Sequence, residues 1–210
     1  MRSVRRGRRF CCIVKHMRIG LYGGSFDPIH LGHLLLARDA VEQLGLDRLI
    51  FLPANHSPHK PEIRITSGPI RLEMIRAAIA DEPRFDADDR ELRRAPPSYA
   101  IDTVREFLAE SPGAEVTYLI GADNVDLLHT WREIDALREL VRFAVFARGD
   151  QVPTLDPGTP VIRRQIEISS TEIRNRIANG ERVRYLVPDE VAALIRHHHL
   201  YPKPPSPPSR

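Results

Sequence analysis

The chain has 210 residues, of which 42% are hydrophobic and 28% are charged, and this balance suits one globular domain with a sizeable core. No apolar run approaches the roughly 20 residues of a membrane-spanning helix, which argues against a membrane protein. The net charge of +3 misleads, because residues 1–16 hold six of the 31 basic side chains and no acidic one. The other residues carry 25 basic and 28 acidic side chains, so the composition argues against a dedicated nucleic-acid-binding domain.

Residues 1–16 and 202–210 read as extensions of a domain that spans residues 17–201. The first segment is rich in arginine, and its apolar stretch is shorter than that of a secretory signal. We therefore expect a disordered basic extension, or a chain that truly starts at Met17. The last segment, PKPPSPPSR, should form a flexible tail. The only two cysteines, Cys11 and Cys12, are neighbours in the sequence, which favours a reducing compartment such as the cytoplasm.

Short apolar segments alternate with amphipathic ones along the domain. The expected strands are Arg18–Tyr22, Arg48–Pro53, Val116–Asp123 and Arg142–Arg148, and the expected helices are Leu31–Leu44, Pro69–Ala80, Tyr99–Ala109 and Asn124–Leu140. This alternation predicts a parallel sheet with helices on both faces. The predicted fold class is thus α/β, a Rossmann-like doubly wound sheet in a single domain with a small C-terminal helical part. Sheets of this kind bind ligands at the carboxyl ends of their strands.

The first expected strand runs into a glycine-rich loop, YGGSFDPIHLGH, which begins at Tyr22. Gly23 and Gly24 lack side chains, so a ligand can approach the backbone closely, and Asp27-Pro28 forms a turn. The first turn of the following helix has N–H groups without helical partners, and the helix dipole favours an anion there. The pattern predicts a phosphate site at this junction.

His30 and His33 lie three residues apart at the start of this helix, so both imidazoles can face the same side. Two histidines alone fall short of a usual zinc ligand set. Imidazole N–H groups can, however, stabilise charge that develops on phosphate oxygens. The simpler alternative is that one of the two histidines only caps the helix.

The segment GGSFDPIHLGH resembles the signature of the HxGH nucleotidyltransferases. Members of this superfamily transfer a nucleotidyl group from a nucleoside triphosphate and release pyrophosphate. The resemblance implies that His30 and His33 are catalytic. It also implies phosphate contacts from the preceding loop, at Gly23, Gly24, Ser25 and Phe26.

The segment EISSTEIRNRI, residues 167–177, can be read in two ways. Ser169 and Glu172 have the spacing of a capping box, which would make the segment simply a well-capped helix. Alternatively, three adjacent hydroxyls and an arginine one turn later form a clamp for a polyphosphate. The segment also resembles the ISSTxxR motif, which accompanies HxGH in this superfamily and contacts the triphosphate. This resemblance favours the clamp, with ATP contacts at Ser169, Ser170, Thr171 and Arg174.

Four further segments resemble the bacterial nicotinate-nucleotide adenylyltransferases, and the likeness extends over about residues 17–201. The segments are PHK (58–60), SYAIDT (98–103), LIGADNVDLLHTW (119–131) and YLVPDEVAALIRHHHLY (185–201). The resemblance implies transfer of the adenylyl group of ATP to nicotinate mononucleotide, which yields deamido-NAD and pyrophosphate in NAD biosynthesis. Mg²⁺ is expected to arrive with ATP and to need few or no protein ligands, so no metal site is assigned to the protein.

The same resemblance implies contacts with both substrates. Lys60 is expected to contact phosphate. Trp131, the only tryptophan, is expected to stack on the pyridine ring, and backbone N–H groups at the start of the helix near residue 100 would receive the nicotinate carboxylate. Asp123 would accept a hydrogen bond from a ribose hydroxyl. The residues expected around the pyridine nucleotide are Tyr99, Ala100, Thr103, Asp123 and Trp131, with alanine at position 100 where the family usually has threonine.

Two other functions stay open on the sequence. Another adenylyl- or cytidylyltransferase of the same superfamily would share both phosphate motifs and differ in its acceptor pocket. A nucleic-acid-binding protein that uses the arginine-rich arm is a different class, and the two intact motifs argue against it. The expected partners are therefore ATP and nicotinate mononucleotide, with no nucleic acid and no membrane.

Overall fold

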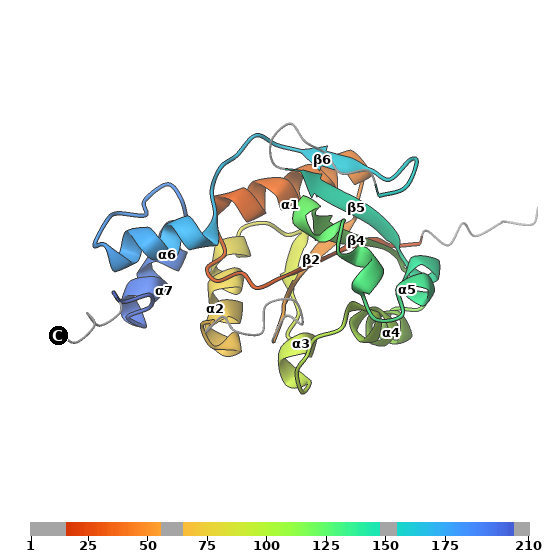
Figure 1. Ribbon diagram of the computed structural model, residues 1–210, viewed down its shortest axis with the longest axis horizontal. Coiled ribbons are helices and arrows are strands. Elements are labelled where there is room, and N and C mark those ends of the chain that lie inside the picture. Colours follow the sequence, from red (N-terminus) through yellow and green to blue (C-terminus); the bar gives the residue numbers. More distant parts are fainter. Residues whose placement is uncertain (1–15, 56–64, 148–154, 204–210) are drawn as a thin grey trace, which may run out of the picture.

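The computed structural model describes residues 16–55, 65–147 and 155–203 (Figure 1). Its centre is a six-stranded sheet in the order β3-β2-β1-β4-β5-β6, in which every pair of neighbours is parallel. This is the Rossmann strand order, in which the chain adds the first three strands on one side of the sheet and then crosses over to add the fourth strand on the other side of the first. The strands are β1 (Arg18–Gly24), β2 (Arg48–Pro53), β3 (Phe85–Ala87), β4 (Glu115–Gly121), β5 (Arg142–Ala147) and β6 (Val161–Arg163). The predicted fold class is confirmed.

The helices cover both faces of the sheet, as predicted. They are α1 (Leu31–Leu44), α2 (Gly68–Ile79), α3 (Arg90–Arg93), α4 (Ala100–Glu110), α5 (Ile134–Leu140), α6 (Ser170–Ala178) and α7 (Asp189–His197), with 3-10 turns η1 (Ala122–Asn124) and η2 (Leu128–Thr130). Side chains of α1, α2 and α7 form one hydrophobic cluster with the sheet, and side chains of α4 and α5 form a second.

Successive residues of the central strands feed these two clusters in turn. Tyr22 and Phe51 belong to the cluster that α1 covers, whereas Leu21 and Ile50 belong to the cluster that α4 covers. Neighbouring side chains of a strand point to opposite faces. Because both faces are covered, the strands are apolar at nearly every position, which is typical of parallel sheets.

The C-terminal part is small and helical, as predicted. In Figure 1, α6 and α7 lie beside α2, at the end of the molecule away from α4 and α5. The loop between them meets the start of α1, where the N–H of Leu31 donates to the carbonyl of Leu186 at 2.9 Å. The chain therefore returns to the neighbourhood of the glycine–histidine loop.

Three differences from the predicted elements concern the sheet edges and the segment after β4. The edge strands β3 and β6 have only three residues each and were not predicted. The predicted helix Asn124–Leu140 is wrong, because the segment forms two 3-10 turns before the shorter α5. Trp131 has extended backbone, with ψ of 140°, and Glu133 has a positive φ of 51°, so no continuous helix can pass through them.

The two ends of the chain lie largely outside the described residues. The basic extension and the tail therefore stay predictions, although His16 is described and its Nδ1 lies 2.6 Å from the carbonyl oxygen of Gly113. Within the described part, no helix combines the length and the apolar character needed to cross a membrane.

Candidate active site

The two histidines form a reciprocal cap at the start of α1. His30 is the N-cap residue, and its Nδ1 accepts a hydrogen bond from the N–H of His33, while the Nδ1 of His33 accepts from the N–H of His30, both at 3.3 Å. Their rings stack with centroids 3.6 Å apart, which confirms that they face the same side. Because Nδ1 is an acceptor in both rings, the proton of each neutral imidazole lies on Nε2. An imidazole can therefore cap the helix through Nδ1 and still act as a donor through Nε2–H.

A side chain at Gly32 would crowd His30 where the histidines meet the second motif. A Cβ at this position would lie 3.0 Å from Nδ1 of His30 and 3.6 Å from the carbonyl oxygen of Ile168. The N–H groups of Leu31 and His33 are already engaged by Leu186 and His30. Two of the first-turn donors that were expected to receive an anion therefore already have partners in the protein.

Phe26 supports His33 from the loop before α1. Its side chain is buried, and its ring packs edge-on against the His33 ring, with centroids 5.1 Å apart. The residue has a positive φ of 47°, which is unfavourable for a side chain of this size. Such a conformation persists when its surroundings hold it, and it is often found at functional sites.

The second motif touches the first directly. Ser169 caps α6 by accepting from the N–H of Glu172 at 3.1 Å, which is the capping alternative that the sequence left open. Ser170 Oγ donates to the carbonyl of Pro28 at 3.0 Å, and Arg174 Nη1 donates to the carbonyl of Asp27 at 2.8 Å. Arg174 Nη2 also donates to Thr171 Oγ1 at 3.0 Å. Two segments far apart in the sequence thus place histidines, hydroxyls and a guanidinium at one edge of the sheet.

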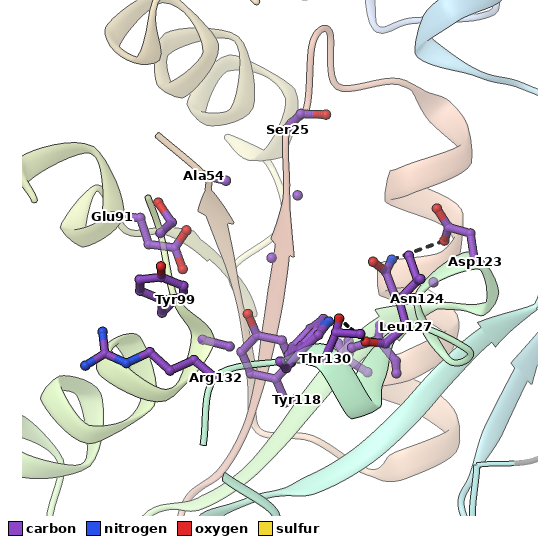
Figure 2. Close-up of a pocket in the computed structure, with 18 residues that line it drawn as sticks. Ser25, Ala54, Glu91, Tyr99, Tyr118, Asp123, Asn124, Leu127, Thr130 and Arg132 are labelled. Atoms are coloured by element: carbon purple, nitrogen blue, oxygen red, sulfur yellow. Dashed lines mark hydrogen bonds between the residues drawn. The ribbon is translucent and has the colours of Figure 1, made fainter. Parts of the chain in front are cut away.

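A pocket of about 510 Å³ opens next to this edge, at the carboxyl ends of β1 and β4 (Figure 2). Gly23, Gly24 and Ser25 line it from the first motif, and the end of β4 lines it through Gly121. The strand order reverses between these two strands, which is where ligands bind in sheets of this type. In Figure 2, Glu91 and Tyr99 lie on the side opposite Asp123. The pocket is large enough for a small molecule.

Comparisons with known proteins agree with this geometry. The cytidylyltransferase-like family model matches residues 21–176. The chain is 41% identical over 193 residues to a probable nicotinate-nucleotide adenylyltransferase of Lactiplantibacillus plantarum, with 90% of each chain covered. It is 43% identical over 189 residues to a protein of the same name from Thermus thermophilus, with 88% of this chain and 100% of the relative covered.

The chain belongs to the nicotinate-nucleotide adenylyltransferase family. The resemblance predicted from its motifs is confirmed. Among solved structures, it is similar to the Plasmodium falciparum nicotinic acid mononucleotide adenylyltransferase complexed with NaAD, with a TM-score of 0.75, 19% identity, and coverage of 89% of this chain and 98% of that one. At that identity the likeness shows the fold alone.

The structure brings most of the predicted pyridine-nucleotide residues of this adenylyltransferase family member into one pocket. Tyr99, Ala100, Asp123 and Trp131 all line it. Thr103 does not: its side chain is fully buried, and its hydroxyl donates to Glu91 Oε1 at 2.8 Å. Thr103 therefore supports the pocket wall from behind. The predicted phosphate contact Lys60 lies outside the described residues.

The sequence reasoning missed a buried polar network behind this wall. Glu91 lines the pocket yet is only 4% exposed, and Arg94 donates to Thr103 Oγ1 and to Glu106 at 3.0 Å. Burial raises the pKa of Glu91, against the opposing effects of Thr103, Arg94 and Ser98. In the sequence Glu91 and Arg94 stand in the run DDRELRR, which has the composition of a solvated surface, so no signal distinguished these two residues.

Proposed function

We propose that this chain transfers the adenylyl group of ATP to nicotinate mononucleotide, with deamido-NAD and pyrophosphate as products. The observation that carries the proposal is the direct contact between the glycine–histidine loop and the Ser170–Arg174 segment, next to a pocket lined by Trp131. A triphosphate needs several donors converging on it, and an aromatic acceptor needs a stacking partner beside it. Family membership supplies the same assignment independently.

The triphosphate contacts are assigned to both motifs. His33 is partly exposed, whereas His30 is 1% exposed, so His33 presents its Nε2–H to the α- and β-phosphates and His30 holds it by stacking. Ser170, Thr171 and Arg174 hold the β- and γ-phosphates. The backbone of the loop at Gly23–Phe26 lies alongside, and Lys60 is proposed as a further contact on its predicted family role alone.

The acceptor contacts are assigned to the pocket. Trp131 stacks on the pyridine ring, and the N-terminus of α4 receives the nicotinate carboxylate through the N–H groups of Tyr99 and Ala100. The N-cap residue Tyr99 makes no side-chain cap hydrogen bond to that terminus. A backbone contact explains how alanine is tolerated at position 100. Asp123, exposed at the pocket rim, accepts from a ribose hydroxyl.

The reaction is an in-line displacement at phosphorus. A phosphate oxygen of nicotinate mononucleotide forms a bond to the α-phosphorus of ATP, and the bond between the α-phosphorus and the bridging oxygen to the β-phosphate breaks. The attacking oxygen is already an anion, so no general base is required. Positioning of the two phosphates and stabilisation of the charge that develops on them supply the catalysis.

Mg²⁺ is proposed to enter as part of the substrate. Among the described residues, no three His, Cys, Asp or Glu side chains are grouped so that they could hold a metal ion. Mg²⁺ usually keeps several waters and binds through phosphates and one or two carboxylates. A metal that is carried by the phosphates of ATP would not need such a group.

The proposal is tested by an acceptor panel. Pyrophosphate release from Mg-ATP is measured with nicotinate mononucleotide, nicotinamide mononucleotide, phosphopantetheine and no acceptor. We expect the highest kcat/KM with nicotinate mononucleotide and formation of deamido-NAD by chromatography. Turnover that is highest with phosphopantetheine would assign the chain to another branch of the superfamily.

The basic arm is tested separately. A variant without residues 1–16 is expected to keep its turnover, and neither form is expected to bind RNA. RNA binding by the full chain that is lost on deletion would instead support a nucleic-acid function. A cytoplasmic location stays a prediction from the cysteine pattern.

A further inference from the structure

A buried arginine joins three loops at the carboxyl edge of the sheet. Arg71, on α2, is 1% exposed. Its guanidinium donates to the carbonyl oxygens of Ser25 at 2.6 Å, Ala54 at 2.7 Å and Thr66 at 2.8 Å. These carbonyls belong to the loop after β1, the loop after β2 and the segment before α2. Only a planar guanidinium has enough fixed donors to join three separate backbones in this way.

Burying the Arg71 guanidinium costs free energy, so its hydrogen bonds must contribute something that the fold needs. Desolvation lowers the pKa of Arg71, and the nearby Asp27 and Tyr201 act against that change. A buried cation is retained only where its hydrogen bonds and charge partners compensate for lost water. An apolar residue at this position could fill the space but could not bond the loops.

Asp27 makes the second half of the network. It is 3% exposed, and its carboxylate accepts from the hydroxyl of Tyr201 at 2.6 Å and from the N–H of Thr66 at 3.1 Å. Its backbone carbonyl accepts from Arg174 at 2.8 Å. Asp27 therefore ties the glycine–histidine loop to α6 and to the chain's final described segment.

The residue between these two anchors is the strained one. Ser25 is held by Arg71 and Asp27 is held by Tyr201, and Phe26 between them has the positive φ of 47°. The Phe26 ring in turn packs against His33. The network thus fixes a backbone conformation that would otherwise relax, and the position of His33 depends on it.

We propose that Arg71, Asp27 and Tyr201 are positioning residues that hold the Ser25–Asp27 backbone ready for the triphosphate. The C-terminal segment then sets the affinity for ATP without touching ATP. This inference rests on the proposed function, because it takes the glycine–histidine loop to be the triphosphate site. The inference adds three residues whose substitution should weaken the binding of ATP and leave the binding of nicotinate mononucleotide unchanged.

The decisive variant is Tyr201→Phe, which removes one hydroxyl and keeps the ring. We expect the Kd for α,β-methylene-ATP, measured by calorimetry, to rise about three- to tenfold, as expected for part of a hydrogen bond to a charged group. The Kd for nicotinate mononucleotide should stay within about twofold, and the melting temperature within about two degrees. Tyr185→Phe is the matched control, because Tyr185 is 73% exposed, and it should change neither Kd.

A second variant tests the arginine. Arg71→Lys keeps the charge but cannot span three carbonyls, so it should weaken binding of the ATP analogue at least as much as Tyr201→Phe. Arg76→Lys, exposed on the same helix, is its control. If Arg71→Lys does not fold, Tyr201→Phe still decides the question.

Three results would overturn the inference. They are an unchanged Kd for the ATP analogue in Tyr201→Phe, equal weakening of both ligands with a fall in melting temperature, and loss of the fold in that variant. The last two would show a purely structural role. Failure of the proposed function has a different signature, since the wild-type chain would then bind the analogue but make no deamido-NAD.

Discussion

Arg174 Nη1 donates to the carbonyl oxygen of Asp27 at 2.8 Å, although 147 positions separate the two residues in the chain. Asp27 precedes the histidine pair and Arg174 belongs to α6, so this bond joins the two motifs that the proposed mechanism needs together. Ser170 adds a second bond of the same kind to Pro28. The site is thus formed by the fold, because neither motif alone contains enough donors for a triphosphate.

Arg174→Ala should lower kcat/KM for ATP by about 10²- to 10³-fold, which is the scale for loss of one donor to a developing phosphate charge. The matched control is Arg176→Ala, two positions further on α6, where the side chain bonds Arg182 and Glu181 on the surface. The control should stay within about twofold of the wild type. Steady-state kinetics with varied ATP would measure both, and equal losses in the two variants would contradict the assignment.

His33→Ala should lower kcat by about 10²- to 10³-fold, because it removes the Nε2–H donor and one half of the reciprocal cap. His197→Ala, exposed near the end of α7, is the control and should have little effect. Initial rates at saturating substrates give the comparison. More than half of the wild-type activity in His33→Ala would show that the imidazole is not part of catalysis.

Trp131→Ala should raise KM for nicotinate mononucleotide while KM for ATP changes little. Ring stacking contributes about 0.5–1.5 kcal/mol beyond buried area, so its loss should raise this KM by at least roughly two- to tenfold. Trp131→Phe should recover part of the loss, since an aromatic ring remains. If KM for ATP rose as much as KM for the acceptor, the indole would not distinguish the two subsites.

Glu91→Gln should flatten part of the pH dependence of stability. Burial raises the pKa of Glu91 above the ordinary value, so the folded state prefers the protonated carboxyl. Its contribution to stability is full below the ordinary glutamate pKa of about 4.3 and is lost as the pH rises through the higher folded-state pKa. The wild type should therefore lose stability relative to Glu91→Gln as pH increases.

This difference is measured from the melting temperatures of both proteins between pH 4 and pH 8, in steps of about one pH unit. Glu110→Gln is the control, because the Glu110 side chain is 58% exposed where it pairs with Arg90. The change with pH should be larger for Glu91→Gln than for this control. A constant difference for Glu91→Gln, or one of the opposite sign, would contradict the assignment of a raised pKa.

Local signals predicted the elements on which the site is built. The helix α1 has the predicted bounds Leu31–Leu44, and Gly45 ends it with a positive φ of 60°, as the position of that glycine indicated. Strand β2 also has its predicted bounds, Arg48–Pro53. In both cases the residues that begin and end the element lie in the sequence beside it, so no distant contact is needed to place them.

Distant contacts decided what the sequence could not show. The edge strands β3 and β6 take their order from pairing with β2 and β5, and three residues are too few for a periodic pattern. Trp131 leaves the predicted helix because it lines the pocket beside Tyr118, so packing overrides helix propensity. Arg71 and Glu91 are charged residues that the fold buries, and their sequence neighbours give no sign of it.

The central claim is that the two motifs bind one triphosphate between them. A crystal structure of this chain with α,β-methylene-ATP and Mg²⁺ tests it most directly. The account predicts phosphate oxygens within hydrogen-bond distance of both His33 Nε2 and the Arg174 guanidinium, roughly 3 Å. An analogue bound with its phosphates against only one of these residues, or elsewhere on the sheet, would contradict it.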